Sequence, residues 1–241
     1  AATRFEQMIA RRIAGEPVYR IIGKRDFHGL TLFLNDATLE PRDDTECLVD
    51  LVLQQIDDPH DTARFLDLGT GTGAIALALL SELPAATALA TDLSSDALQM
   101  AQKNSLFNGL ESRTTFLSSD WLQQVVGQFD FIVSNPPYIE SATLEQLATE
   151  VIAHDPRRAL DGGELGLDAY RIILATAVDH LVPHGFLALE IGSQQRAAVA
   201  ELAGLSGWVL RQTGQDLAGR DRALVFSRAD NPRHDDTKGT E

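Results

Sequence analysis

The feature that most constrains the fold is an alternation that begins at residue 64, where short apolar segments of strand length follow one another with helical stretches between them. The apolar segments occupy residues 64–68, 87–91, 114–118, 129–134 and 185–192. The stretches with helical periodicity occupy residues 74–82, 95–108, 165–181 and 194–203. Such alternation predicts βαβ units, and hence an α/β fold with a mostly parallel sheet covered by helices on both faces.

The two ends of the chain depart from this pattern. Near the C-terminus, residues 208–213 and 222–228 are apolar segments with no helical stretch between them, which predicts an antiparallel hairpin at one edge of the sheet. Near the N-terminus, residues 5–14 predict a helix that ends at Gly15, and residues 26–42 predict a β-hairpin that leads into the main domain.

Composition and charge narrow the classes of function. The chain of 241 residues has a net charge of −15, which repels a phosphate backbone, and the pair Arg157-Arg158 is expected to be solvated surface. Cys47 is the single cysteine, which fits a reducing setting. No apolar run is long enough to cross a bilayer, and the histidines lack metal-ligand spacing. We expect a cytoplasmic protein with no metal, no membrane contact and no direct nucleic-acid binding.

A glycine-rich loop follows the first strand of the alternation. In "LDLGTGTGA", Gly69, Gly71 and Gly73 separate that strand from the next helix, where a tight turn and free backbone N–H groups suit an anionic ligand group. Asp92 ends the next strand, 21 residues beyond Gly71, where a carboxylate can accept hydrogen bonds from ribose hydroxyls. The loop predicts a cofactor that contains a nucleoside. With Ala74 after G-x-G-x-G, the loop alone leaves a dinucleotide possible.

Two further groups of polar and aromatic residues follow strands of the same sheet. Asp120 and Trp121 follow the third strand, where a carboxylate beside an aromatic face suits an adenine ring. Asn135-Pro136-Pro137-Tyr138 follows the fourth strand.

The two prolines of this motif make a stiff bend, which can hold the Asn135 side-chain oxygen and the Pro136 carbonyl as converging acceptors. Two acceptors match one planar NH₂ group, as on adenine, cytosine, guanine or a glutamine side chain. Holding both hydrogens orients the nitrogen lone pair towards an electrophile, and the Tyr138 ring can stack on a flat substrate or face a sulfonium. A plain turn is the alternative interpretation of the motif.

Together, "LDLGTGTGAIALAL", "SDW" and "IVSNPPYI" resemble the HemK/PrmC family, the S-adenosylmethionine-dependent enzymes that methylate a glutamine of peptide chain release factors. The stretches "ATLEPRDDTECLV" and "DPRRALDGGELGLDAYRIIL" are narrower marks of the same family, and the resemblance extends over about residues 16–228. It implies a Rossmann-like, seven-stranded class I methyltransferase domain over residues 26–228. Residues 1–25 would then be a remnant of an N-terminal helical region, and residues 229–241 a disordered tail.

The resemblance also implies roles for particular residues. The substrate glutamine would be held by Asn135, Pro136, Pro137 and Tyr138, of which Asn135, Pro136 and Tyr138 would be catalytic. The cofactor S-adenosylmethionine, with no metal, would be bound by Asp67, Gly69, Thr70, Gly71, Thr72, Gly73, Asp92, Asp120, Trp121 and Asn135. Residues 42–46 would lie near the site without an assigned role. Asp43 and Asp155 stand where the family usually has proline and glutamate.

Several alternatives share part of this pattern. A ribosomal-protein glutamine methyltransferase has the same chemistry and differs in its docking surface. An adenine-N6 DNA methyltransferase would grip a flipped-out base, but the net charge of −15 argues against it. An NAD-dependent oxidoreductase fits the glycine loop and Asp92, yet leaves Asn135 to Tyr138 unexplained. A non-catalytic binding protein is the last alternative.

Overall fold

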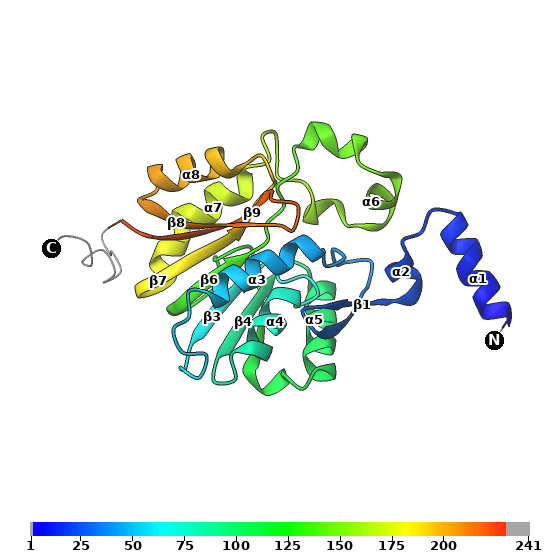
Figure 1. Cartoon of the computed structure of the whole chain (residues 1–241), viewed down its shortest axis with the longest axis horizontal. Coiled ribbons are helices and arrows are strands. Elements are labelled where there is room, and N and C mark those ends of the chain that lie inside the picture. The colour runs from blue at the N-terminus through cyan, green and yellow to red at the C-terminus, as the bar shows by residue number, and fades with distance from the viewer. Residues whose placement is uncertain (1, 230–241) are drawn as a thin grey trace.

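The computed structural model describes residues 2–229, so the predicted disordered tail lies almost entirely outside the described residues. Its main feature is a seven-stranded sheet of order β5-β4-β3-β6-β7-β9-β8 (Figure 1). The strands are β3 (Arg64–Leu68), β4 (Thr87–Asp92), β5 (Thr114–Ser118), β6 (Phe129–Ser134), β7 (Leu181–Glu190), β8 (Trp208–Gln215) and β9 (Asp221–Arg228). β9 is antiparallel to both neighbours, and the other pairs are parallel. The predicted α/β fold with a C-terminal antiparallel hairpin is confirmed.

Helices cover both faces of the sheet (Figure 1). One face carries α3 (Glu46–Leu53), α4 (Ala74–Glu82) and α5 (Ser95–Phe107), and the other carries α7 (Asp168–Thr176) and α8 (Arg196–Leu205). Because both faces are covered, the central strands are apolar on both sides: Phe65, Leu66 and Leu68 of β3 are all fully buried.

An aromatic row fixes the register of the three central strands. Phe65, Phe131 and Phe186 come from β3, β6 and β7, and their rings stack with centroids 4.7 Å and 5.1 Å apart. Paired residues on neighbouring strands make these contacts, since Phe65 is opposite Phe131 and Phe131 is opposite Phe186. Each pair contributes about 1 kcal/mol beyond its buried area. The strand ends that carry the candidate site are therefore held in a fixed relation.

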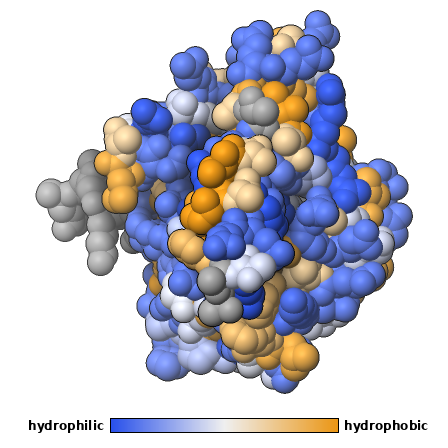
Figure 2. Space-filling view, turned by 90° about the vertical axis from the view of Figure 1, so that its right-hand side faces the viewer, coloured by the Kyte–Doolittle hydropathy of each residue, from blue (hydrophilic) through white to orange (hydrophobic). Residues whose placement is uncertain are grey.

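The N-terminal segment contains α1 (Ala2–Ile13), α2 (Val18–Ile22), β1 (Lys24–Phe27) and β2 (Leu30–Phe33). The hairpin is shorter than the predicted 26–42 and begins earlier, because it turns at His28-Gly29, both of which have positive φ. Residues 34–42 instead form a loop, and α2 was not predicted. α1 lies beside α2 and away from the sheet (Figure 1). Apolar residues gather on the face of the molecule where α1 lies (Figure 2). The exposed apolar residues of α1 are Phe5, Ile9 and Ile13.

The segment between β6 and α7 contains elements that sequence reasoning did not assign. These are η3 (Ser141–Gln146), α6 (Thr149–His154) and η4 (Arg157–Ala159). A parallel bridge between Ile139 and Asp161 closes this segment into a loop over the sheet edge.

Other bounds also differ from the predictions. Short 3-10 turns occur at η1 (Asp43–Thr45), η2 (Glu111–Arg113) and η5 (Ala177–His180), and α3 was missed. α7 ends at Thr176, five residues before the predicted end, because apolar periodicity continues through η5 into β7. Within residues 2–229, no helix combines the length and the apolar character that crossing a membrane requires.

Candidate active site

The candidate site lies at the carboxyl ends of β3, β4, β5 and β6. The chain adds β4 and β5 on one side of β3 but β6 and β7 on the other, so the strand order reverses between the adjacent β3 and β6. In open parallel sheets, ligands bind at such a reversal, outside the carboxyl ends of the strands. A cavity of about 190 Å³ lies there, lined by residues that follow all four strands.

The glycine loop forms one wall of this first cavity. Gly71 and Gly73 have φ of 56° and 84°, which glycine adopts without strain, and Gly73 directly precedes α4. The Gly71 N–H donates to Asp92 Oδ2 at 2.9 Å, and Ser94 N–H donates to Asp92 Oδ1 at 2.8 Å. The carboxylate is therefore held at the cavity wall. Of the predicted cofactor residues, the first cavity is lined by Gly69, Thr70, Gly71, Thr72, Asp92, Asp120, Trp121 and Asn135.

Two predicted cofactor residues, Asp67 and Gly73, do not line the cavity. Asp67 is fully buried beneath the loop, where Oδ2 accepts a hydrogen bond of 2.6 Å from the Thr70 hydroxyl and Oδ1 has no partner. Burial raises the pKa of Asp67 to about 7 although the Thr70 bond lowers it. Asp67 thus supports the loop from below, and its contact with a cofactor stays a prediction.

Trp121 closes the first cavity at the β5 side. Its backbone has a positive φ of 50°, which is uncommon for a residue other than glycine, and its ring reaches towards the glycine loop at Gly69. Neighbouring Asp120 lines the cavity, and its Oδ2 accepts a hydrogen bond from Gln123 at 3.0 Å. An aromatic face beside a carboxylate is thus present where an adenine ring would need it.

A second cavity, of about 200 Å³, adjoins the first and shares with it the lining residues Leu39, Arg42, Asn135 and Ala159. Tyr138 and Glu190 are two of its polar lining residues, and its apolar lining residues are Leu39, Ile139, Leu147, Val151, Ala159 and Leu160. Burial raises the pKa of the Tyr138 hydroxyl to about 12, so this group is neutral near pH 7. The motif residues are divided: Asn135 lines both cavities, Pro137 the first and Tyr138 the second, whereas Pro136 is buried and lines neither.

Glycines of the loop 160–168 hold the backbone of the motif. A Cβ on Gly162 would lie 2.8 Å from both the Pro137 carbonyl oxygen and Tyr138 Cα, so only glycine fits there. The Gln195 side chain donates to the Tyr138 carbonyl at 2.9 Å from the other side. The stretch "LDGGELG" belongs to a family mark to which the sequence analysis gave no role. It packs directly against the bend of the motif.

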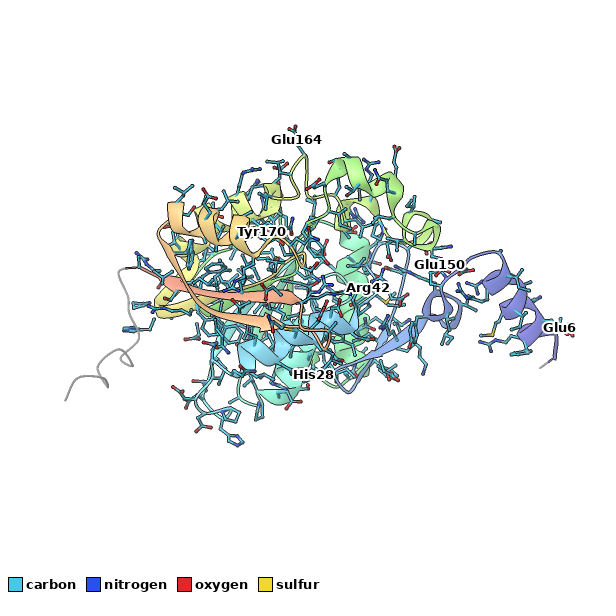
Figure 3. The ribbon with its side chains drawn as sticks, turned by 45° about the horizontal axis from the view of Figure 1, so that its top comes forward. Glu6, His28, Arg42, Glu150, Glu164 and Tyr170 are labelled. Atoms are coloured by element: carbon cyan, nitrogen blue, oxygen red, sulfur yellow. The ribbon has the colours of Figure 1, made fainter. Side chains whose placement is uncertain are left out.

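Sequence reasoning left Arg42 and Thr45 without a role and missed Glu190. Arg42 lines both cavities and forms an ion pair of 2.7 Å with Asp155; Figure 3 places it in the middle of the molecule, well inside Glu6 and Glu150. Thr45 is buried and accepts a hydrogen bond of 3.3 Å from Asn135 Nδ2. Glu190 ends β7, so the rule that identified Asp92, an acid at a strand's carboxyl end, would have found it.

The Glu190 carboxyl is 2% exposed. Burial raises its pKa to about 7, while hydrogen bonds from Thr45 and Asn135 and the charge of Arg222 lower the pKa. Arg158, predicted as solvated surface, is exposed but also lines the first cavity and donates to Ser94 Oγ at 2.8 Å. In the described part of the chain, no group of histidine, cysteine, aspartate or glutamate side chains is arranged to hold a metal ion.

Comparisons with known proteins identify the family of the chain. The family model of the methyltransferase small domain matches residues 43–178. A release factor glutamine methyltransferase from Agrobacterium fabrum is 48% identical over 230 residues, which cover 94% of this chain and 80% of the relative. One from Moorella thermoacetica is 46% identical, over 95% and 81%.

Among solved structures, a methyltransferase from Pyrococcus furiosus superposes with a TM-score of 0.61 at 18% identity, covering 94% of this chain and 98% of its own. That likeness concerns the fold alone. The sequence relatives are much closer and match nearly the whole chain, including the stretches that build both cavities. The chain therefore belongs to the family of release factor glutamine methyltransferases.

Proposed function

We propose that this methyltransferase transfers a methyl group from S-adenosylmethionine to the side-chain amide nitrogen of a glutamine in a peptide chain release factor, in its Gly-Gly-Gln loop. The observation that carries the proposal is the position of Asn135, the residue of the motif that lines both cavities. A donor in one cavity and an acceptor in the other would meet at this amide. The names of the relatives supply the class of acceptor.

The first cavity fits S-adenosylmethionine. The cofactor's carboxylate suits the backbone N–H groups of the glycine loop, its ribose hydroxyls suit the carboxylate of Asp92, and its adenine suits the space beside Trp121 and Asp120. Arg42 and Arg158 add positive charge to the lining, which favours a carboxylate further. When bound, S-adenosylmethionine supplies an electrophilic methyl group on a sulfonium sulfur.

The second cavity fits the side chain of the acceptor. Its apolar walls suit the methylene groups of a glutamine, and an amide entering along them would arrive at Asn135. The Asn135 Oδ1 atom would accept one N–H of the substrate amide and so turn its lone pair towards the methyl group. The Pro136 carbonyl, expected from the sequence as the second acceptor, belongs to a buried residue that lines neither cavity. The Asn135 acceptor favours the positive charge that develops on the nitrogen as the N–C bond forms and the S–C bond breaks. The nitrogen then loses a proton to solvent.

Incubation with labelled S-adenosylmethionine tests this proposal. Purified release factors, ribosomal proteins and DNA would each be offered as acceptor, with Asn135→Ala as the inactive control and mass spectrometry to locate the added methyl group. We expect label on a release factor glutamine. Label only on a ribosomal protein would move the proposal to that alternative, and label only on DNA would refute it.

Cofactor binding separates the remaining alternatives. Titration with S-adenosylmethionine and NAD should give saturable binding of the former alone, whereas tight NAD binding without it would favour an oxidoreductase. Binding of S-adenosylmethionine with no transfer to any acceptor would indicate a non-catalytic protein. Because release factors act on ribosomes, the proposal carries with it a cytoplasmic location and a protein partner rather than a nucleic acid.

A further inference from the structure

The Glu190 carboxyl is buried beside the amide of Asn135. β6 and β7 are parallel neighbours in which Ser134 is opposite Leu189, so Asn135, just beyond the end of β6, lies next to Glu190, the last residue of β7. Both line the second cavity. A carboxyl at this depth is costly unless it has a specific role, and the proposed methyl transfer does not use it directly.

The hydrogen bonds around Glu190 fix which end of the Asn135 amide faces inward. Hydrogen bonding with Asn135 lowers the pKa of Glu190 and so favours the ionised carboxylate; because an ionised carboxylate can only accept, Asn135 Nδ2 is the donor in this interaction. The same nitrogen donates to Thr45 Oγ1 at 3.3 Å. Both contacts therefore engage the nitrogen, and Oδ1 is the end of the amide that they leave for a ligand.

Other charged groups near Glu190 do not take over this role. Arg222 is held by ion pairs with Asp44 at 3.0 Å and Asp216 at 3.1 Å. Glu190 Oε2 has no hydrogen-bond partner, so Arg222 does not engage that oxygen. The remaining titratable groups that interact electrostatically with Glu190 are Asp44, Cys47, Tyr138 and Tyr170. None of these is a cation that could replace the amide as its partner. Arg42, which lines the same cavity, is paired with Asp155 at 2.7 Å.

We propose that Glu190 is a positioning residue, which holds the Asn135 amide with Oδ1 turned towards the acceptor cavity and acts through Asn135 and Thr45 rather than on the substrate. A flipped amide would present its N–H groups to the N–H groups of the substrate, where two donors face each other. The inference rests on the proposed function for the identity of the acceptor. The orientation of the Asn135 amide is a property of the free protein.

A double-mutant cycle between Glu190→Gln and Asn135→Ala tests the proposal. Glutamine keeps the shape of Glu190 but is neutral and brings an NH₂ group of its own, so we expect kcat to fall roughly 10-fold while the Kd for S-adenosylmethionine changes less than about twofold. In the Asn135→Ala background, Glu190→Gln should change kcat by less than about twofold, because its target is gone. If the two effects multiply instead, Glu190 acts independently of Asn135 and the proposal fails.

Two further variants separate positioning from a general effect of substitution. Thr45→Val removes the hydroxyl at constant shape and should also lower kcat, whereas Thr45→Ser keeps the hydroxyl and should restore most of it. Glu201→Gln on the exposed face of α8 is the control for loss of a carboxylate and should leave kcat unchanged. Equal losses in Thr45→Val and Thr45→Ser would contradict a role for the hydroxyl.

Nuclear magnetic resonance gives a readout that needs no acceptor. In protein with isotope-labelled asparagine, the side-chain amide signal that disappears in Asn135→Ala belongs to Asn135. We expect this signal to shift with pH around a midpoint of about 7 in the wild type and to lose the shift in Glu190→Gln. If the wild type labels no release factor, the proposed function fails, but this signal still decides the inference. An identical titration in Glu190→Gln would overturn it.

Discussion

The two cavities that share Asn135 are built in different ways. The wall of the first comes mainly from residues that directly follow β3, β4, β5 and β6, so each contribution is local in the sequence. The wall of the second combines the loop before α3, the segment between β6 and α7, and the end of β7. Each region has one buried carboxyl, Asp67 or Glu190, with its pKa raised to about 7 by burial. Under the proposed function, we therefore expect cofactor binding to depend on strand-end geometry and acceptor binding on long-range packing.

Asn135→Ala has the largest expected effect, because it removes the side chain at the junction. If the cavities bind their ligands separately, turnover should fall roughly 100-fold or more, as loss of an oriented polar contact can, while the Kd for S-adenosylmethionine changes little. Single-turnover kinetics and calorimetric titration measure the two quantities. Equal losses in both would show that the cavities work as one unit.

Asp92→Ala tests the first cavity alone. The change removes the ribose acceptor and frees the N–H groups of Gly71 and Ser94, so the Kd for S-adenosylmethionine should rise roughly 10- to 100-fold. Asp96→Ala is the matched control, since Asp96 is an exposed carboxylate at the start of α5 that does not line the first cavity. Comparable weakening by both variants would mean that general charge, rather than the cavity, governs binding.

Gly162→Ala tests the acceptor side through the backbone. The added Cβ would lie 2.8 Å from backbone atoms of Pro137 and Tyr138, so the bend of the motif must shift; we expect kcat to fall roughly 10-fold with about 2 kcal/mol lost from the free energy of unfolding. The Kd for S-adenosylmethionine should stay the same. Gly204→Ala is the control, because a Cβ there meets nothing within 4 Å and alanine favours the α8 helix. Full activity in Gly162→Ala would show that the packing of Gly162 against the motif is not needed for catalysis.

The two buried carboxyls predict how stability changes with pH. The pKa of each is about 7 in the folded protein and near 4 when unfolded, so the folded state binds these protons more tightly. Their contribution to stability is full below about pH 4 and is lost as pH rises through about 7. Between about pH 5 and pH 8, the free energy of unfolding of the wild type should fall as pH rises. In Asp67→Asn and in Glu190→Gln this fall should be smaller by roughly 1 to 3 kcal/mol each, measured by denaturant titration. A wild-type curve parallel to both variants would show that neither carboxyl is linked to folding in this range.

The sheet was predictable because its signal is local. Strands such as β3 and β6 are short, mostly apolar segments, and their bounds match the predicted residues 64–68 and 129–134. The hairpin was placed wrongly at residues 26–42, because Leu34 and Leu39 extend its apolar pattern although β2 ends at Phe33. The residues after β2 belong to a cavity wall and not to a strand, a distinction that only tertiary packing makes.

Site residues that lie close to a strand end in the sequence could be predicted, and those that lie far from one could not. Gly69 and Asn135 directly follow strands and Asp92 ends one; local motifs at those positions predicted them as site residues, and all three line the first cavity. Thr45 and Arg42 precede the main sheet by many residues, so no spacing rule connects them to the site, and the Thr45 contact with Asn135 depends on how α3 packs against the sheet. Asp67 was predicted to contact the cofactor; it is buried beneath the loop and does not line the first cavity, a position that the sequence alone did not indicate.

The close packing of Gly162 and Gly166 against the motif has a consequence for protein engineering. Asn135 to Tyr138 follow a strand that many parallel sheets could offer, which makes the motif look portable. A Cβ at either glycine would collide with the backbone of Pro137 or Tyr138, and Gln195 fixes that backbone from α8's side. If the four residues were grafted into another sheet, their side chains would be present, but the backbone bend that orients them would not be held in place. The smallest transferable unit is the motif together with the loop that follows η4 and Gln195, the residue directly before α8.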